Sequence, residues 1–205
     1  FTLSPVHCAA GIALSSDLMT ATCKTNNRCM VLGSQCFTEG KHYWEVVVND
    51  CDYGTVFIGV AARLAGSSHQ CWRDYGYVNN RTFQDHASEC YYGVQYCKGD
   101  TIGVLLDMDV GELSFLKIGK EFYYSHHNVL KLGVAGHRMR RSDHLLHVPL
   151  YPSFGFKRAG DSITVRPVGV EEKGGERSWL DQFLFMQTAL KTVECGDPEI
   201  MPHAM

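Results

Sequence analysis

The chain has 205 residues, of which 45% are hydrophobic and 20% are charged, so it can bury a sizeable core as one globular domain. Its formal net charge of −3 gives it no general attraction for nucleic acid or for an anionic membrane surface. No apolar run approaches the roughly 20 residues that a helix needs to span a bilayer. These values favour a soluble globular protein over a nucleic-acid-binding or membrane-spanning one.

Short runs with strand-like composition recur along the chain and are punctuated by glycine. We predict strands at residues 11–14, 29–32, 42–48, 55–61, 91–95, 101–107, 112–116, 131–135, 151–156 and 162–165. The run from Tyr43 to Val48 is rich in aromatic and β-branched side chains, which fit a pleated, half-buried surface. Helical periodicity is almost absent before residue 178. The pattern therefore predicts an all-β sandwich or barrel.

Residues 99–120 indicate a hairpin of two strands around a tight turn. Val104 and Leu106 alternate with less apolar neighbours, at the period of two that puts one face of a strand on a core. The turn Asp109-Val110-Gly111 follows, and the alternation resumes at Leu113.

The two aspartates of this hairpin, Asp107 and Asp109, suggest a calcium loop. Such a loop starting at Asp107 would need glycine at its sixth position and glutamate at its twelfth, where this chain has Glu112 and Ile118. The aspartates are better explained as strand-end and turn residues.

The composition changes after Pro167. Residues 169–177 are charged and glycine-rich, which is typical of a linker, and Ser178 and Asp181 then have the spacing of a capping box. We predict a sandwich over 1–168, a linker over 169–177, an amphipathic helix over 178–194 and a flexible tail over 195–205. The helix either packs back onto the sandwich or docks on a neighbouring domain of a longer parent chain.

Nine cysteines are spread along the chain without a Cys-x-x-Cys pair that would indicate zinc. A chain of this length does not need a disulfide framework, so we expect reduced, mostly buried thiols. His144 and His147 lack a third ligand at a recognised spacing, and we expect neither a metal nor another cofactor. The chain opens at Phe1 without a signal-peptide pattern, and we expect a piece of a larger cytoplasmic, or alternatively nuclear, protein.

Five motifs in chain order resemble the SPRY domain family in its longer PRY–SPRY form. The most recognisable is Phe-Thr-Glu-Gly-Lys-His-Tyr-Trp-Glu-Val at residues 37–46. The other four are residues 14–18 with 31–33, 57–61, 99–120 and 150–154, and the match covers roughly residues 3–166. Phe57 departs from the family, which usually has tryptophan at that position.

The resemblance implies a bent antiparallel β-sandwich of two sheets, here followed by a short C-terminal α-helix. It also implies a noncatalytic module that presents loops at one edge to a protein or peptide partner, often as the substrate-targeting part of a ubiquitin ligase. The usual nucleophile-elbow, phosphate-loop and zinc-protease motifs are missing from the sequence. The competing hypothesis is a structural domain that packs against neighbouring domains of its parent chain through the C-terminal helix and binds no loop ligand.

The resemblance places one binding loop at residues 63–75. This loop carries residue types that are frequent in interface hot spots, and we predict partner-binding roles for Arg63, His69, Trp72, Arg73 and Tyr75. Tyr53, in the preceding turn, is predicted to border the same surface. The alternative for Trp72 is that it closes one end of the sandwich.

Two further segments are candidates for partner binding. Lys157 and Arg158 follow a predicted strand in another loop that the family uses, and their alternative is a solvated turn. Residues 136–147 form an insertion relative to the family, with a basic patch of Arg138, Arg140 and Arg141. Arginine forks pair with carboxylates and phosphates, so this patch suits an acidic peptide or a phosphate. Its alternative is a mobile solvated loop.

Overall fold

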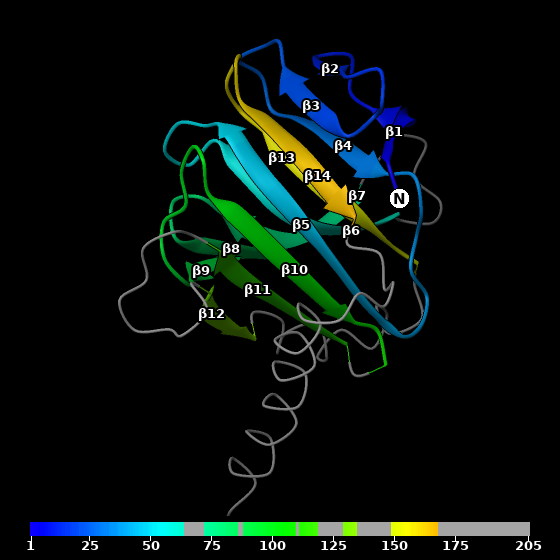
Figure 1. Ribbon diagram of the computed structural model, residues 1–205, viewed down its shortest axis with the longest axis vertical. Helices are drawn as coiled ribbons and strands as arrows, with labels where there is room; N and C mark the ends of the chain where they lie inside the picture. Colours follow the sequence, from blue (N-terminus) through cyan, green and yellow to red (C-terminus); the bar gives the residue numbers. More distant parts are fainter. Residues whose placement is uncertain (64–71, 86–87, 110, 119–128, 135–148, 168–205) are drawn as a thin grey trace, which may run out of the picture. The chain divides into compact units, whose positions relative to one another are not determined.

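Fourteen β-strands and no helix make up the described part of the chain, and they pair into two antiparallel sheets of seven strands each. The computed structural model describes residues 1–63, 72–85, 88–109, 111–118, 129–134 and 149–167, all within one compact unit, Phe1–Val168 (Figure 1). The predicted all-β sandwich of two antiparallel sheets is therefore confirmed. The predicted linker, helix and tail lie outside the described residues.

The strands of sheet A are β1 (Leu3–Cys8), β4 (Cys29–Gly33), β6 (Val56–Arg63), β7 (Trp72–Val78), β8 (Thr82–Asp85), β9 (Ser88–Tyr91) and β13 (Leu150–Phe156). They lie in the order β1-β4-β13-β6-β7-β8-β9. The strands of sheet B are β2 (Ile12–Leu14), β3 (Thr20–Cys23), β5 (Lys41–Asp50), β10 (Thr101–Asp107), β11 (Glu112–Ile118), β12 (Val129–Val134) and β14 (Ser162–Pro167). They lie in the order β12-β11-β10-β5-β14-β3-β2.

The hairpin predicted at the centre of the chain is formed by β10 and β11, which pair in register along their whole length. Its aspartates are turn and strand-end residues. Asp109 Oδ1 accepts a 2.8 Å hydrogen bond from the Gly40 N–H, and Asp107 forms a 3.2 Å ion pair with Lys41. Both contacts fasten the hairpin to the start of β5, so this segment belongs to the scaffold.

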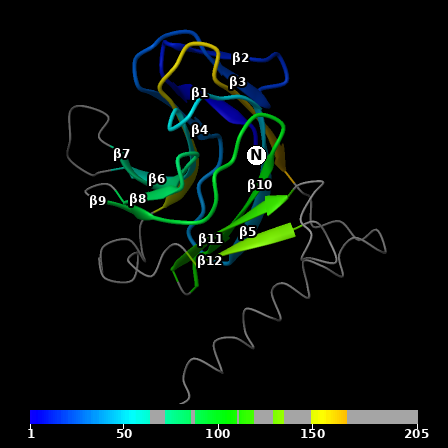
Figure 2. The ribbon, with the colours of Figure 1, turned by 90° about the vertical axis from the view of Figure 1, so that its left-hand side faces the viewer.

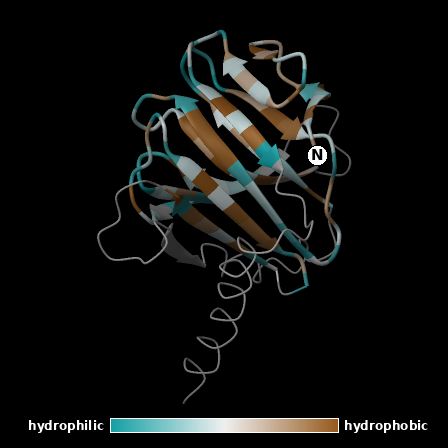
Figure 3. Ribbon diagram, in the orientation of Figure 1, coloured by the Kyte–Doolittle hydropathy of each residue, from teal (hydrophilic) through white to brown (hydrophobic). Residues whose placement is uncertain are grey.

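The core lies between the two sheets, which form two layers in Figure 2, and hydrophobic residues concentrate along the strands in Figure 3. The layers meet where the rings of Tyr77 on β7 and Phe115 on β11 come within 5.5 Å, centroid to centroid. Tyr96 packs against Tyr77, and its hydroxyl donates toward the carbonyl oxygens of Val56 (2.9 Å) and Tyr77 (3.0 Å). The buried Tyr96 hydroxyl therefore has hydrogen-bond partners, so its burial between the two sheets is not destabilising.

Strands β6 and β7 approach each other closely at Gly59 and Gly76, which are paired across the two strands. A Cβ atom on Gly59 would overlap the carbonyl oxygen of Tyr75, and one on Gly76 would lie 2.6 Å from the ring of Phe57. Glycine inside a strand often marks such a close approach of backbones. The two glycines are therefore required by the packing of the central strands of sheet A.

The structure contains four strands that the sequence analysis did not predict, namely β1, β3, β7 and β8. It also places β9 at Ser88–Tyr91 instead of 91–95. The strand ends at Tyr91, and the ring of the next residue, Tyr92, packs against Tyr77 at 5.2 Å between centroids. Strand β1 contains Pro5, which lowers strand propensity but is tolerated at the edge of a sheet.

We expect Gly59→Ala to destabilise the fold more than Gly155→Ala. The methyl group at position 59 would meet backbone, which cannot yield without separating β6 from β7, and we expect a loss of about 3 kcal/mol in the free energy of unfolding. A Cβ atom at position 155 would lie 3.2 Å from the Phe57 side chain, which can relax, so we expect a loss of about 1 kcal/mol. Urea unfolding measures both, and equal losses would contradict the close approach of the two strands.

Candidate functional site

Most of the described residues that were predicted as partner-binding fall at two opposite ends of sheet A. The first residue of β6 pairs with the last residue of β13, so the turns that carry Tyr53 and Lys157 lie at one end. The last residue of β6, Arg63, pairs with Trp72 at the other end. The eight residues of β6 separate these ends by about 23 Å. The candidates therefore form two separate groups.

The loop predicted at residues 63–75 is shorter than expected, because both of its ends belong to strands. Arg63 ends β6, while Trp72, Arg73 and Tyr75 lie in β7. Charged residues inside β7 obscure the period of two in the sequence. Tyr75 is only 4% exposed and belongs to the core cluster, so it is scaffold rather than surface. The other predicted candidates, His69, Arg138, Arg140 and Arg141, lie outside the described residues.

Two exposed tyrosines, Tyr53 and Tyr91, lie at the same end of sheet A. We call the surface formed by Tyr53, Asn80, Tyr91 and Lys157 the tyrosine edge. Tyr53 is 64% exposed and Tyr91 is 89% exposed. They flank the turn between β7 and β8: the Tyr53 hydroxyl lies 3.5 Å from the Asn80 carbonyl oxygen, and Tyr91 pairs with Thr82. Thr82 Oγ1 donates to Asn80 Oδ1 at 2.6 Å, which orders the turn between the two rings.

Asn79 fastens the turn that carries Tyr53 to the neighbouring hairpin. Its side chain is 1% exposed, donates a 2.6 Å hydrogen bond to the Asp52 carbonyl oxygen, and accepts a 3.2 Å bond from the Val56 N–H. Within the same turn, the Thr55 hydroxyl donates to the Asp52 carbonyl oxygen at 2.9 Å. Tyr53 is therefore presented from a backbone that side-chain hydrogen bonds hold in place.

A cleft that is partly open to solvent lies beside the tyrosine edge. Its lining includes Met30 and Lys157, together with Arg28 and Asp74. Arg28 Nη2 lies 2.8 Å from Asp74 Oδ2. Arg28 precedes β4 and Asp74 lies in β7, and the strands β13 and β6 lie between β4 and β7 in the sheet. The ion pair therefore bridges the cleft across these two strands. Asp74 is 8% exposed, and the arginine compensates for the burial of its charge.

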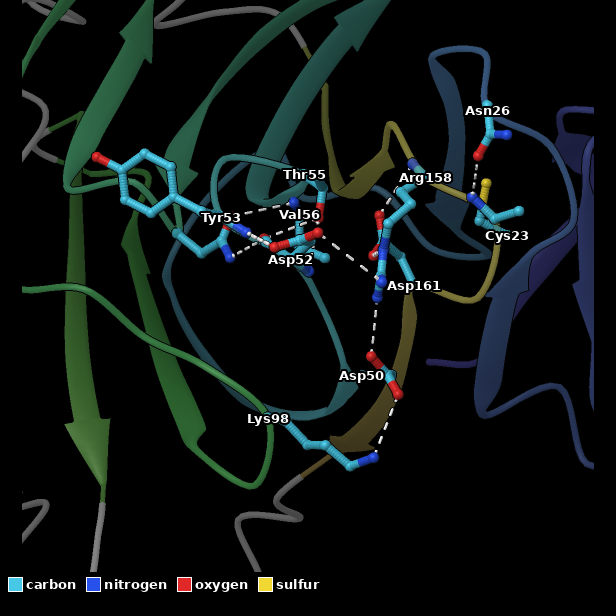
Figure 4. A network of polar contacts seen from close by, with 12 residues as sticks. Cys23, Asn26, Asp50, Asp52, Tyr53, Thr55, Val56, Lys98, Arg158 and Asp161 are labelled. Carbon is cyan, nitrogen blue, oxygen red and sulfur yellow. Dashed lines mark hydrogen bonds and ion pairs between the residues drawn. The ribbon is translucent and has the colours of Figure 1, made fainter.

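Arg158, predicted as a partner-binding residue, lies at the centre of an ion-pair network in Figure 4. Its backbone N–H and its Nε each donate a 3.0 Å hydrogen bond to the carboxylate of Asp161, which has no exposed surface. Its Nη2 lies 2.9 Å from Asp50, which also pairs with Lys98 at 3.2 Å. Arg158 thereby joins the turn between β13 and β14 to the end of β5.

The cations of this network act on the carboxyl group of Asp50. Lys98 first, and Arg158 second, hold the pKa of Asp50 below its ordinary value by favouring the ionised form. Since the pKa is lower in the folded state, this contribution to stability is present above the unfolded pKa. It is lost as the pH falls through the folded pKa.

The chemistry that the tyrosine edge offers is aromatic contact, hydrogen bonding and a lysine cation. Within the described ranges, no cluster of three or more His, Cys, Asp or Glu side chains could hold a metal ion. The same part of the chain has no helix that is long and apolar enough to cross a membrane.

Sequence reasoning did not identify Tyr91, Asn79 or Asp161 as residues of this region. Tyr91 falls at the start of a run predicted as a strand, where nothing in the sequence distinguishes an exposed end from a buried one. The pair Asn79-Asn80 is a turn signal that could have located the β7–β8 turn. Asp161 follows Arg158 by three residues across Ala-Gly, a spacing that fits a tight turn closed by a side chain.

Comparison with known proteins identifies relatives by sequence. The family model described as "SPRY domain" matches residues 41–167. The chain is 33% identical over 144 residues to the dual specificity protein kinase splA of Dictyostelium discoideum, and 25% identical over 143 residues to Ret finger protein-like 4B of Homo sapiens. These matches cover 65% and 64% of this chain, but only 5% and 54% of the two relatives. The chain thus spans about half of one relative's length and a small part of the other's.

Solved structures show the same fold. The SPRY domain of human HERC1 matches with a TM-score of 0.60 and 17% identity, over 82% of this chain and 99% of that one. The TRIM65 PSpry domain matches with a TM-score of 0.56 and 19% identity, over 80% of this chain and 89% of that one. At these identities the likeness concerns the fold alone.

We expect Asp161→Ala to lower the free energy of unfolding by about 3 kcal/mol. The substitution removes the acceptor of two hydrogen bonds and leaves a backbone N–H of the turn without that partner. Lys157→Ala, at the exposed neighbouring position, is the matched control and should change the value by less than about 0.5 kcal/mol. Urea unfolding of both variants measures the difference, and a loss at position 161 as small as that at position 157 would show that the clamp does not hold the turn.

Proposed function

Since this chain belongs to the SPRY domain family, whose members are protein-interaction modules, we propose that it recognises a peptide or protein partner through the tyrosine edge. The observation that carries the proposal is the exposure of Tyr53 and Tyr91, 64% and 89%, on either side of one ordered turn. Tyrosine is enriched in interface hot spots because its ring gives a large contact area and its hydroxyl a hydrogen bond.

The fixed backbone of the turns that carry Tyr53 and Lys157 supports this role. The turn of Tyr53 is held by Asn79, and the turn between β13 and β14 is held by the Arg158–Asp161 clamp. A partner that binds such a surface does not have to order it first, so less of the binding free energy is lost in conformational entropy. Lys157, exposed beside the cleft, adds a cation that an acidic group of the partner can approach.

We also propose the setting in which the module works. SPRY domains are typically noncatalytic, and we assign no reaction to this one. The relatives that match in sequence are longer than this chain, which supports a module of a larger protein. By family resemblance we propose a ubiquitin ligase as the parent, with this domain selecting its substrate. The many thiols support a reducing compartment, the cytoplasm or the nucleus.

The test compares proteins captured from a cell lysate by the wild-type chain and by three variants, quantified by mass spectrometry. The double variant Tyr53→Ala with Tyr91→Ala removes both rings. Val6→Ala is the matched control, because Val6 is 81% exposed on β1, the opposite edge strand of sheet A. Phe183→Ala alters the predicted C-terminal helix, which the structural hypothesis requires.

We expect a set of proteins that the wild type and Val6→Ala capture equally and that the double variant loses by at least about tenfold, since two hot-spot residues contribute about 1.4 kcal/mol or more. Thermal unfolding checks that the double variant is folded. Retention of the whole set by the folded double variant would overturn the proposal. Loss of the set with Phe183→Ala alone would favour the structural hypothesis.

A further inference from the structure

Two buried cysteines from different sheets meet beneath the turn between β3 and β4. Cys23 is the last residue of β3 in sheet B, and Cys29 is the first residue of β4 in sheet A. Their Sγ atoms are 3.2 Å apart, and the residues are 1% and 7% exposed. Both are free thiols. Nothing in the interaction edge described above uses this pair.

We propose that Cys23 and Cys29 are a redox modification site, where a small-molecule disulfide converts the two thiols into an intramolecular disulfide that links sheet A to sheet B. The geometry carries this inference. The two sulfurs are already in contact, and an S–S bond of about 2 Å requires them to approach by only about 1 Å more. The five-residue turn between the two cysteines keeps them neighbours even when it opens.

The reaction balances with oxidised glutathione as the oxidant. One cysteine thiolate attacks the glutathione disulfide, which forms a mixed disulfide and releases one glutathione thiolate. The second cysteine thiolate then attacks the protein sulfur of that mixed disulfide and displaces the second glutathione. Two thiol protons leave the protein and protonate the two released glutathione thiolates. The protein loses two electrons, and one glutathione disulfide is reduced to two thiols.

Access to the sulfurs sets the rate of this reaction. Burial, together with the neighbouring Cys23 sulfur, raises the pKa of Cys29 to about 12, so little thiolate is present near neutral pH. The turn above the pair is mostly exposed, with Lys24, Asn26 and Arg28 all on the surface. Opening of this turn admits the oxidant, so we expect oxidation over hours rather than seconds.

The disulfide would fix a turn that contacts the β13–β14 turn, which carries Lys157, and that lines one side of the cleft. Asn26 Oδ1 accepts a 3.0 Å hydrogen bond from the Ala159 N–H, and Arg28 pairs with Asp74 across the cleft. Oxidation would therefore make this side of the cleft more rigid. This consequence for recognition rests on the proposed function, whereas the disulfide itself does not.

The experiment incubates the reduced chain with oxidised glutathione, blocks the remaining thiols with N-ethylmaleimide and digests the product with trypsin without reduction. Trypsin cuts after Lys24 and Arg28, so Cys23 and Cys29 end on separate peptides that only a disulfide can join. The same peptides also contain Cys8 and Cys36, and fragmentation spectra assign the linked sulfurs. Repeating the assay with Cys8→Ser and Cys36→Ser removes that ambiguity.

We expect a Cys23–Cys29 linked peptide pair, and a Tm of the oxidised chain about 5 °C above that of the reduced chain, because the cross-link restricts the unfolded state. Cys97→Ser, which removes an exposed thiol, should leave both results unchanged. Cys29→Ser should abolish both the linked peptide pair and the rise in Tm. If that variant does not fold, the peptide map of the wild-type chain is sufficient to decide the test. Recovery of Cys23 and Cys29 as maleimide adducts, as stable glutathione adducts, or in a Cys8–Cys29 link would overturn the proposal. Because this readout involves no partner, it is independent of whether the tyrosine edge binds one.

Discussion

The carboxylate of Asp161 has no exposed surface, and a charge removed from water must be matched by donors inside the protein. Arg158 provides two of them, one from its backbone and one from its guanidinium group, and the same guanidinium continues to Asp50 at the end of β5. Asp161 also accepts, at its own carbonyl oxygen, the N–H of Cys23 in β3. Through its side chain and its backbone, Asp161 thus connects β3, the end of β5 and the turn that presents Lys157.

The tyrosine edge lies next to this network, because Arg158 Nη1 is 4.0 Å from Asp52 Oδ2, one residue before Tyr53. Side-chain hydrogen bonds hold the turn of Tyr53 to the β7–β8 hairpin, and Tyr91 lies on the strand that pairs with that hairpin. Asn79, which holds the turn of Tyr53, is buried and hydrogen-bonded, while the two rings are exposed. Such a surface exposes hydrophobic area while the backbone that carries it stays ordered. That combination distinguishes a binding edge from a solvated loop.

The fold was predictable where the signal is local. The β10–β11 hairpin follows from alternation and turn residues, and the bounds of β10, Thr101–Asp107, agree with the predicted strand. The partition of site residues was not predictable, because it depends on strand register. Tyr53 and Trp72 are near in sequence, yet β6 carries the chain from one end of sheet A to the other between them. Arg158 resembles a surface cation in the sequence, and only its placement against the buried Asp161 reveals a structural role.

Site-specific photo-crosslinking in cells can show whether the partner binds at the tyrosine edge. A photoreactive benzoylphenylalanine would replace Tyr53 in one variant and Val6 in another. Both positions are well exposed, Tyr53 in the turn before the central strand β6 and Val6 on the edge strand β1. We expect a discrete covalent adduct from position 53 and none from position 6. Adducts from position 6 alone, or the same adducts from both positions, would contradict it.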